Sequence, residues 1–142
     1  MQSNIICSGA LFYSTNTKRF LFLQRTAVKT KDTWGLVGGR MRYTESAFEG
    51  LKREIIEEVN QTPRFKKIIP LEMFTSNDQK FFFHTYLIAI ESEFLPKLNK
   101  EHTGYCWCAY ECWPNSLHAG LRNTLNNKAI KGKLQTILDL IT

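Results

Sequence analysis

The alternation of apolar and polar residues in the first third of the chain predicts two paired strands. Residues 5–13 and 19–24 are rich in aliphatic and aromatic side chains, and the polar residues 14–17 lie between them, so we expect a hairpin. Residues 25–32 are polar and show no period, which indicates an irregular segment. Residues 34–39 contain three glycines, a density typical of tight backbone turns or of close approach to a bound molecule.

A helical period is clearest in residues 46–59. The apolar residues that recur at this period, and that predict one buried face, are Ala47, Phe48, Leu51, Ile55 and Val59. Ser46, with Glu49 three positions later, fits a capping box at the start of the helix. Asn60 tolerates the left-handed backbone of a helix end, and Pro63 prevents continuation of the helix.

The second half of the chain continues with strands and ends with helices. Strands are expected at residues 65–74, 81–90 and 105–110, a polar turn at 75–80, a loop at 93–103, and helices at 117–125 and 129–141. There is no internal repeat and no linker-like stretch. This order predicts an α+β fold, a mixed β-sheet sandwich flanked by α-helices, built as one domain of residues 1–142.

Composition agrees with one compact domain. The chain has 142 residues, of which 43% are hydrophobic and 13% aromatic, enough for a sizeable core. No apolar run approaches the roughly 18 residues that a membrane-spanning helix needs. The first residues also lack the basic start and apolar stretch of a secretory signal. We therefore expect a cytoplasmic protein with no membrane partner.

Charge and cysteine content add little to the choice of function. The net charge of +6 mildly favours a polyanionic partner, but the basic residues are scattered, and a basic solvated surface explains the charge better. The four cysteines are Cys7, Cys106, Cys108 and Cys112. We expect reduced, packed thiols; zinc is the less favoured alternative, because no second ligand pair stands at finger spacing.

Three glutamates of the expected helix point to a divalent metal. Glu54, Glu57 and Glu58 stand at i, i+3 and i+4, so their carboxylates emerge on one face, where they repel one another. A hard cation such as Mg²⁺ removes this repulsion, since it prefers carboxylate and phosphate oxygens. Arg53 lies four positions from both Glu49 and Glu57 and is suited to hold either carboxylate. Considered alone, these residues also agree with an ordinary solvated acidic face.

The surroundings of these glutamates resemble the Nudix box. The matching positions, at fixed spacing over twenty residues, are Gly39, Glu45, Arg53, Glu54, Ile55, Glu57 and Glu58. The resemblance implies a Nudix-type fold in which the three helix glutamates ligate Mg²⁺, with Mn²⁺ as a substitute. It also implies that Arg53 and Glu45 hold the loop and the helix together.

The resemblance extends beyond the box but is incomplete at its end. Asn60 and Gln61 stand where the family pattern has a glycine and an aliphatic residue; asparagine can keep the helix end, whereas Gln61 loses an apolar anchor. Residues 33–39 are similar to the tryptophan-containing strand before many Nudix loops. Residues 101–107 are similar to a family loop that runs into a core strand.

The implied reaction is attack of water on a phosphorus atom of a diphosphate, with Mg²⁺ neutralising charge. A helix carboxylate, Glu101 or His102 would remove the proton of the water, and the sequence does not choose among them. Arg53 completes the set of residues expected to act in catalysis.

The candidates for substrate contact lie near the expected phosphate end. They are Arg25, Arg40, Arg42, Gly38 and Gly39, and the arginines can donate bidentate hydrogen bonds to phosphate oxygens. Tyr43, Phe74 and Phe83 could stack on a base, although aromatic residues in strands more often belong to the core. His84 and His118 are expected to be packed among apolar neighbours.

Three functions agree with these residues. The first is a pyrophosphohydrolase of a nucleoside diphosphate derivative: a nucleoside triphosphate, a nucleotide sugar, ADP-ribose or a dinucleoside polyphosphate. The second is an RNA 5′-end pyrophosphohydrolase, and the third is a catalytically idle nucleotide-binding module, against which the intact glutamates argue. The resemblance also makes a homodimer an expectation, because many members of the family are dimers.

Overall fold

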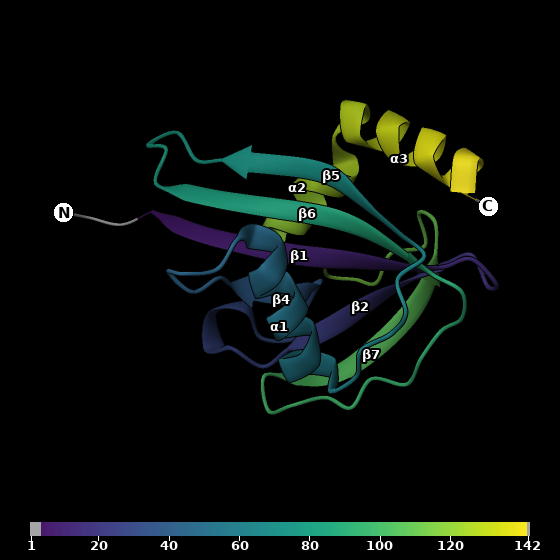
Figure 1. Cartoon of the computed structure of the whole chain (residues 1–142), viewed down its shortest axis with the longest axis horizontal. Helices are drawn as coiled ribbons and strands as arrows, with labels where there is room; N and C mark the ends of the chain where they lie inside the picture. The colour runs from purple at the N-terminus through teal and green to yellow at the C-terminus, as the bar shows by residue number, and fades with distance from the viewer. Residues whose placement is uncertain (1–3, 142) are drawn as a thin grey trace.

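The computed structural model describes residues 4–141, and its centre is the long strand β1 (Ile5–Ser14) (Figure 1). Strand β6 (Phe81–Ile90) runs parallel to β1 along its whole length, and β5 (Lys67–Thr75) pairs antiparallel with β6 at the edge of the sheet. These three strands carry many of the aromatic and aliphatic residues that predicted them.

On its other side β1 changes partners along its length. Its first half pairs antiparallel with β4 (Val37–Arg40), and its last two residues pair with β2 (Arg19–Arg25). Strand β2 in turn pairs with the short β3 (Trp34–Gly35) and with β7 (His102–Ala109). The seven strands therefore form one branched, mixed sheet, and the expected α+β class is confirmed.

Helices cover both faces of this sheet. Ala10 and Phe12 of β1 belong to one buried cluster, which packs under helix α1 (Ala47–Val59). Leu11 and Tyr13 alternate with them and face the opposite side, where helices α2 (Ala119–Asn126) and α3 (Lys128–Ile141) bury their apolar residues. Figure 1 shows α1 in front of the strands and α2 behind them. None of the helices over residues 4–141 has the length and apolar character that crossing a membrane requires.

Helix α1 is set by local interactions, as expected. The Ser46 hydroxyl accepts the Glu49 backbone N–H, and the Glu49 carboxylate accepts the Ser46 N–H, which completes the capping box. Asn60 ends the helix in the left-handed conformation, with φ 54° and ψ 35°. Gln61 donates from its side chain to the Leu95 carbonyl, so a polar contact stands where the family has an apolar anchor.

Several element boundaries differ from the sequence prediction because pairing partners are distant in sequence. The strand expected at residues 105–110 begins at His102, which pairs with Arg25, so the predicted loop at 93–103 ends earlier. The strand expected at 65–74 is shifted to Lys67–Thr75, and the glycine-rich residues 34–40 form β3 and β4. Helix α2 begins at Ala119, because the residues before it bridge to Trp34. Val28–Thr30 form a short 3-10 turn in the segment expected to be irregular.

Candidate functional site

The three glutamates of α1 lie beside β4, and two of them contact its glycines. Glu58 is buried, 3% exposed, and its carboxylate accepts the Gly38 N–H at 2.7 Å. Glu54 lies so close to Gly39 that a Cβ there would stand 2.7 Å from its Oε2. Glu57 is more exposed, with 46% of its side chain accessible. We call these three residues the glutamate face. Because Gly38 and Gly39 have no side chains, the carboxylates of Glu58 and Glu54 can lie directly against β4.

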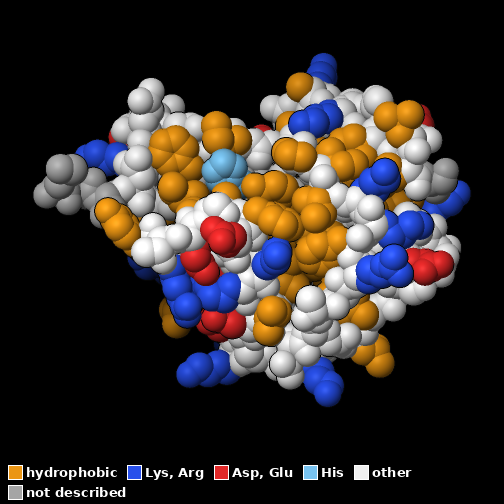
Figure 2. Space-filling view, viewed as in Figure 1, with side chains coloured by type: hydrophobic (Ala, Val, Ile, Leu, Met, Phe, Trp, Pro, Cys, Tyr) orange, Lys and Arg blue, Asp and Glu red, His pale blue; other side chains and the backbone are white. Residues whose placement is uncertain are grey.

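Arg53 ties the glutamate face to the loop before the helix. Its guanidinium donates to Glu45 at 2.8 and 3.0 Å, to Glu54 at 2.9 Å and to Glu57 at 3.2 Å. It also donates to the backbone carbonyl of Arg40 at 3.1 Å. Of its two expected partners, Glu57 is therefore bound, whereas the Glu49 carboxylate is engaged in the capping box. On the molecular face that carries α1, acidic and basic side chains lie together next to an apolar area (Figure 2).

The electrostatics of the glutamate face are those of crowded carboxylates. Burial raises the pKa of Glu58 to about 8; the Gly38 N–H and Arg25 oppose this rise, and the negative charges of Glu54 and Glu101 add to it. Burial also raises the pKa of Glu54, against the effect of Arg53. By contrast, hydrogen bonds from Arg53 and from the Arg42 backbone lower the pKa of Glu45 to about 2.

These residues fit a divalent cation, although across residues 4–141 no three acidic, histidine or cysteine side chains already stand in an arrangement that holds a metal. The charge of Glu54 adds to the raised pKa of Glu58, the charge of Glu57 adds to that of Glu54, and Glu101 acts on both. A cation would relieve this repulsion, and all the donor atoms are carboxylate oxygens, which a hard ion such as Mg²⁺ prefers. Arg53 neutralises part of the negative charge of Glu54 and Glu57, to which the ion would bind.

The loop before β7 brings Glu101 to the glutamate face, and His102 follows it as the first residue of β7. The Asn99 side chain donates to the Glu57 carbonyl at 3.0 Å and accepts the Glu101 backbone N–H at 2.9 Å, so it links this loop to the end of α1. Glu101 is exposed. His102 is 7% exposed, and its Nδ1 is buried without a hydrogen-bond partner within the described part of the chain.

His102 should make the protein acid-sensitive in a defined range. Burial, aided by Arg25, lowers the pKa of His102 from 6.5 to about 4. Between these values the unfolded chain binds the proton and the folded chain does not, so stability falls as pH decreases from 6.5 to 4. We expect His102→Gln to reduce this loss by about 2 kcal/mol, less than the full shift because solvent screens part of the ring's field. Urea unfolding of both proteins at pH 7, 5.5 and 4 measures it, and parallel curves would contradict the assignment.

The basic and glycine candidates for substrate contact are not all brought together. The Arg25 Nε–H donates to the Thr30 hydroxyl at 3.0 Å, and its guanidinium extends over Gly35, 3.7 Å from the position of a Cβ there. Arg25 makes no ion pair within residues 4–141 and acts electrostatically on Glu58 and His102. The Arg42 guanidinium, 67% exposed, lies 3.7 Å from Glu57.

The remaining candidates for substrate contact lie around β4. The guanidinium of Arg40 acts on Cys7, the residue that pairs with it on β1. Gly38 and Gly39 contact the glutamate face, as described above. The two glycines, Arg25 and Arg42 thus border this face. Arg40 is connected to it only through Arg53, which donates to its backbone carbonyl.

His118, which the sequence predicted to be packed among apolar neighbours, lies near Arg25. The His118 N–H donates to the Trp34 carbonyl at 2.8 Å, and the Trp34 N–H donates to Ser116 at 2.9 Å, so two backbone bonds fix the segment before α2. Burial and the charge of Arg25 lower the pKa of His118, which places its ring within electrostatic reach of that guanidinium. The sequence gives no sign that His118 lies near Arg25, because the contact of residues 116–118 with Trp34 joins segments that are distant along the chain.

The aromatic candidates fall into different environments. Tyr43 is 95% exposed in the loop before α1, and Phe74 is 49% exposed on the edge strand. Phe83 packs against the strand-β1 glycine, with its ring 3.0 Å from a Cβ built at Gly9. His84 is half-buried and stacks on Tyr86, with ring centroids 6.5 Å apart, so its expected packing role is retained.

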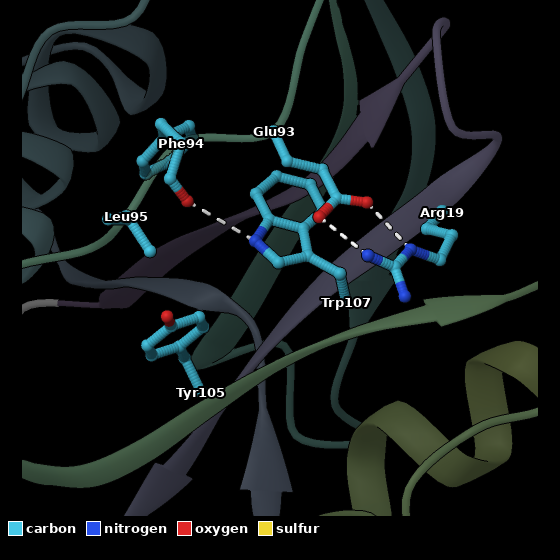
Figure 3. A pocket seen from close by; sticks show the side chains of 6 residues that line it. All are labelled: Arg19, Glu93, Phe94, Leu95, Tyr105 and Trp107. Atoms are coloured by element: carbon cyan, nitrogen blue, oxygen red, sulfur yellow. Dashed lines mark hydrogen bonds and ion pairs between the residues drawn. The ribbon is translucent and has the colours of Figure 1, made fainter.

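A cavity of about 320 Å³ lies beside the loop that leads to Glu101. We call it the aromatic cavity, and its lining residues are Arg19, Glu93, Phe94, Leu95, Tyr105 and Trp107. Figure 3 shows the Tyr105 ring and Leu95 at one end, the Arg19–Glu93 ion pair at the other, and the Trp107 indole between them. The indole N–H donates to the Phe94 carbonyl at 3.3 Å. The sequence did not predict this cavity; the placement of Tyr105 and Trp107 on one strand face was its only signal.

Comparisons with known proteins agree with this geometry. A model of the NUDIX domain matches residues 6–127. A search of curated proteins gives no significant match.

Similar solved structures include the Nudix hydrolase RenU from M. smegmatis, at TM-score 0.75 and 13% identity, covering 100% of this chain and 90% of that one. A MutT protein from Methanosarcina mazei Go1 has TM-score 0.70 and 23% identity, covering 94% and 97%. An Ap4A hydrolase from C. elegans, solved as a binary complex, has TM-score 0.70 and 18% identity, covering 92% and 97%. At these identities, each similarity establishes a shared fold.

Proposed function

The chain belongs to the NUDIX domain family and is a hydrolase of phosphoric anhydride bonds, and we propose that it is a Mg²⁺-dependent enzyme that cleaves the diphosphate linkage of a nucleoside diphosphate derivative. The observation that carries this proposal is the glutamate face. Glu54 and the buried Glu58 crowd together against the glycines of β4, at a cost that a bound cation would offset.

In this proposal, Glu54, Glu57 and Glu58 hold Mg²⁺, or Mn²⁺ in its place. The ion would supply charge neutralisation for the diphosphate oxygens and polarisation of the attacking water. Arg53 keeps Glu54 and Glu57 in fixed positions and connects them to the loop through Glu45. The network therefore pre-organises the carboxylates, which limits the reorganisation needed when substrate binds.

We propose Glu101 as the group that accepts the proton of the water. Its side chain is exposed, and it is close enough to Glu54 and Glu58 to raise the pKa of both. His102 is less suited because its ring is buried. Arg25 makes no ion pair in the described part of the chain and acts electrostatically on Glu58, so we assign it, of the three arginines, to bind a phosphate oxygen.

The nucleoside of the substrate has a candidate position in the aromatic cavity. The Arg19–Glu93 pair cancels its own charge, so the rest of the lining, three aromatic residues and Leu95, carries no net charge. Such a surface suits a neutral planar ring better than a phosphate. The cavity adjoins the loop that carries Glu101, which would let one molecule reach both places.

Tyr105→Ala should therefore raise KM about tenfold with little change in kcat, because it removes ring contact equally from bound substrate and transition state. Tyr105→Phe keeps the ring and should keep KM within about twofold. Steady-state kinetics on the best substrate measures both. A fall in kcat at constant KM in the alanine variant would reject the assignment.

A substrate panel tests the proposed function. Purified protein with Mg²⁺ is offered dNTPs, nucleotide sugars, ADP-ribose, dinucleoside polyphosphates and 5′-triphosphorylated RNA, in parallel with Glu57→Gln. We expect turnover of at least one small nucleotide, lost on chelation and strongly reduced in the variant. An Ap4A hydrolase among the similar structures makes dinucleoside polyphosphates a natural first test.

Two other functions are separated by the same panel. Turnover confined to RNA would favour an RNA 5′-end pyrophosphohydrolase, for which the net charge of +6 is the supporting observation. Nucleotide binding without any turnover would instead favour a catalytically idle module. Equal activity of the wild type and Glu57→Gln would reject the glutamate face as the active centre.

A further inference from the structure

Two thiols of β7 lie next to each other on the strand face opposite the aromatic cavity. The Sγ atoms of Cys106 and Cys108 are 3.3 Å apart, and both residues are half-buried. They pair with Phe22 and Phe20 of β2 and pack against the core that α2 and α3 cover. Side chains two apart on a strand share a face but normally stand side by side, so this close approach means that both thiols turn toward each other.

A disulfide is a poor outcome for this pair. Residues two apart on an antiparallel strand have Cα atoms about 6.8 Å apart, at the upper limit for a disulfide. Burial, with Cys108 adding to it, raises the pKa of Cys106 to about 12, so its thiol carries its proton until a ligand displaces it. The 3.3 Å separation does allow a single atom to bond both sulfurs, because the two sulfurs then need not come within S–S bonding distance.

We propose that Cys106 and Cys108 form a bidentate site for a soft, thiophilic centre: a trivalent arsenical or a soft divalent cation such as Cd²⁺. With an organoarsenical oxide, each thiol gives up its proton, two As–S bonds form, and the arsenic oxygen leaves as water while arsenic stays trivalent. With a soft cation, two protons are released to solvent. Sulfur ligands favour such centres over hard ions such as Mg²⁺, which keeps this site separate from the glutamate face.

The surroundings favour capture at this pair over the other cysteines. Only Cys106 and Cys108 have their sulfurs in contact within the described part of the chain. Cys7 lies on β1 and Cys112 is an exposed residue beyond the end of β7, and neither has a sulfur neighbour among the described contacts. The alternate residues of β7, Tyr105 and Trp107, line the aromatic cavity, so a group bound to the two sulfurs would lie on the other face of the strand.

The test uses phenylarsine oxide and Cd²⁺ on the intact, reduced protein. Intact-mass measurement should find one arsenic adduct with loss of water, retained on dilution, in the wild type and in the matched controls Cys7→Ser and Cys112→Ser. Cys106→Ser and Cys108→Ser should each weaken capture at least tenfold. Thermal unfolding shows whether each variant is folded. If one variant is not folded, the result for the other tests the proposal. Equilibrium dialysis in excess Mg²⁺, which competes for the carboxylates of the glutamate face, should give one Cd²⁺ per chain with the same dependence.

An adduct that persists in both Cys106→Ser and Cys108→Ser, or one that disappears in Cys112→Ser, would overturn the proposal, as would failure of both probes to bind. None of these readouts uses nucleotide hydrolysis. The dithiol site and the proposed enzymatic function can therefore fail separately.

Discussion

Glu58→Gln should lower kcat by about 1,000-fold while leaving the protein folded. The buried carboxylate accepts the Gly38 N–H and faces Glu54, so it is the member of the glutamate face with the most fixed position. Glutamine keeps the shape and, through its carbonyl, can keep the Gly38 bond, but it removes one negative charge from the proposed metal site. The loss should therefore appear in turnover and in Mg²⁺ affinity, measured by kinetics at increasing Mg²⁺.

The stability of the same variant gives an independent check. Because the folded-state pKa of Glu58 is raised to about 8, folded protein without metal binds more protons than the unfolded chain between pH 4.5 and 8, and its stability falls as pH rises through that range. Glutamine removes this dependence. At pH 7 without metal, Glu58→Gln should be at least as stable as the wild type, even though it is nearly inactive.

Glu49→Gln is the matched control on the same helix. Glutamine can still accept the Ser46 N–H at the capping box, and Glu49 lies outside the glutamate face. We expect activity within about twofold of the wild type. If Glu58→Gln were fully active, or if the two variants lost activity equally, the metal assignment would fail.

The parts of this molecule that the sequence predicted well are those fixed by neighbours along the chain. The capping box at Ser46 and the left-handed Asn60 set both ends of α1, and the helical period then places all three glutamates on one side. The same locality explains why Phe81–Ile90 was predicted at its observed boundaries: a continuous apolar run needs no partner to be recognised.

What the sequence could not supply are contacts between distant segments. His102 joins β7 because Arg25 pairs with it, and residues 116–118 lie beside Trp34 through an isolated bridge. The aromatic cavity combines β2, β7 and the loop between β6 and β7, so no single stretch of sequence carries its pattern. Burial of Glu58 and of His102 likewise depends on tertiary packing, which decides their pKa values.

Gly38→Ala and Gly39→Ala should separate folding from catalysis. Gly38 has φ of 153°, and a Cβ there would stand 2.1 Å from the Ser8 carbonyl oxygen. Both the backbone strain and the clash with β1 are unavoidable, since neither partner is a flexible side chain. We expect Gly38→Ala to lose about 3 kcal/mol or more of unfolding free energy, measured by urea denaturation.

Gly39 differs because its neighbour can move. A Cβ at this position would meet the Glu54 carboxylate at 2.7 Å, and that side chain can rotate away at little cost to the fold. Rotation takes Glu54 from Arg53 and from the position we assign to a metal ligand. Gly39→Ala should thus stay within about 1 kcal/mol of wild-type stability and lose about 100-fold in kcat. If Gly39→Ala were stable and fully active, the contact between Gly39 and Glu54 would have no part in the reaction. If both alanine variants were destabilised equally, β4 would tolerate no side chain at either position.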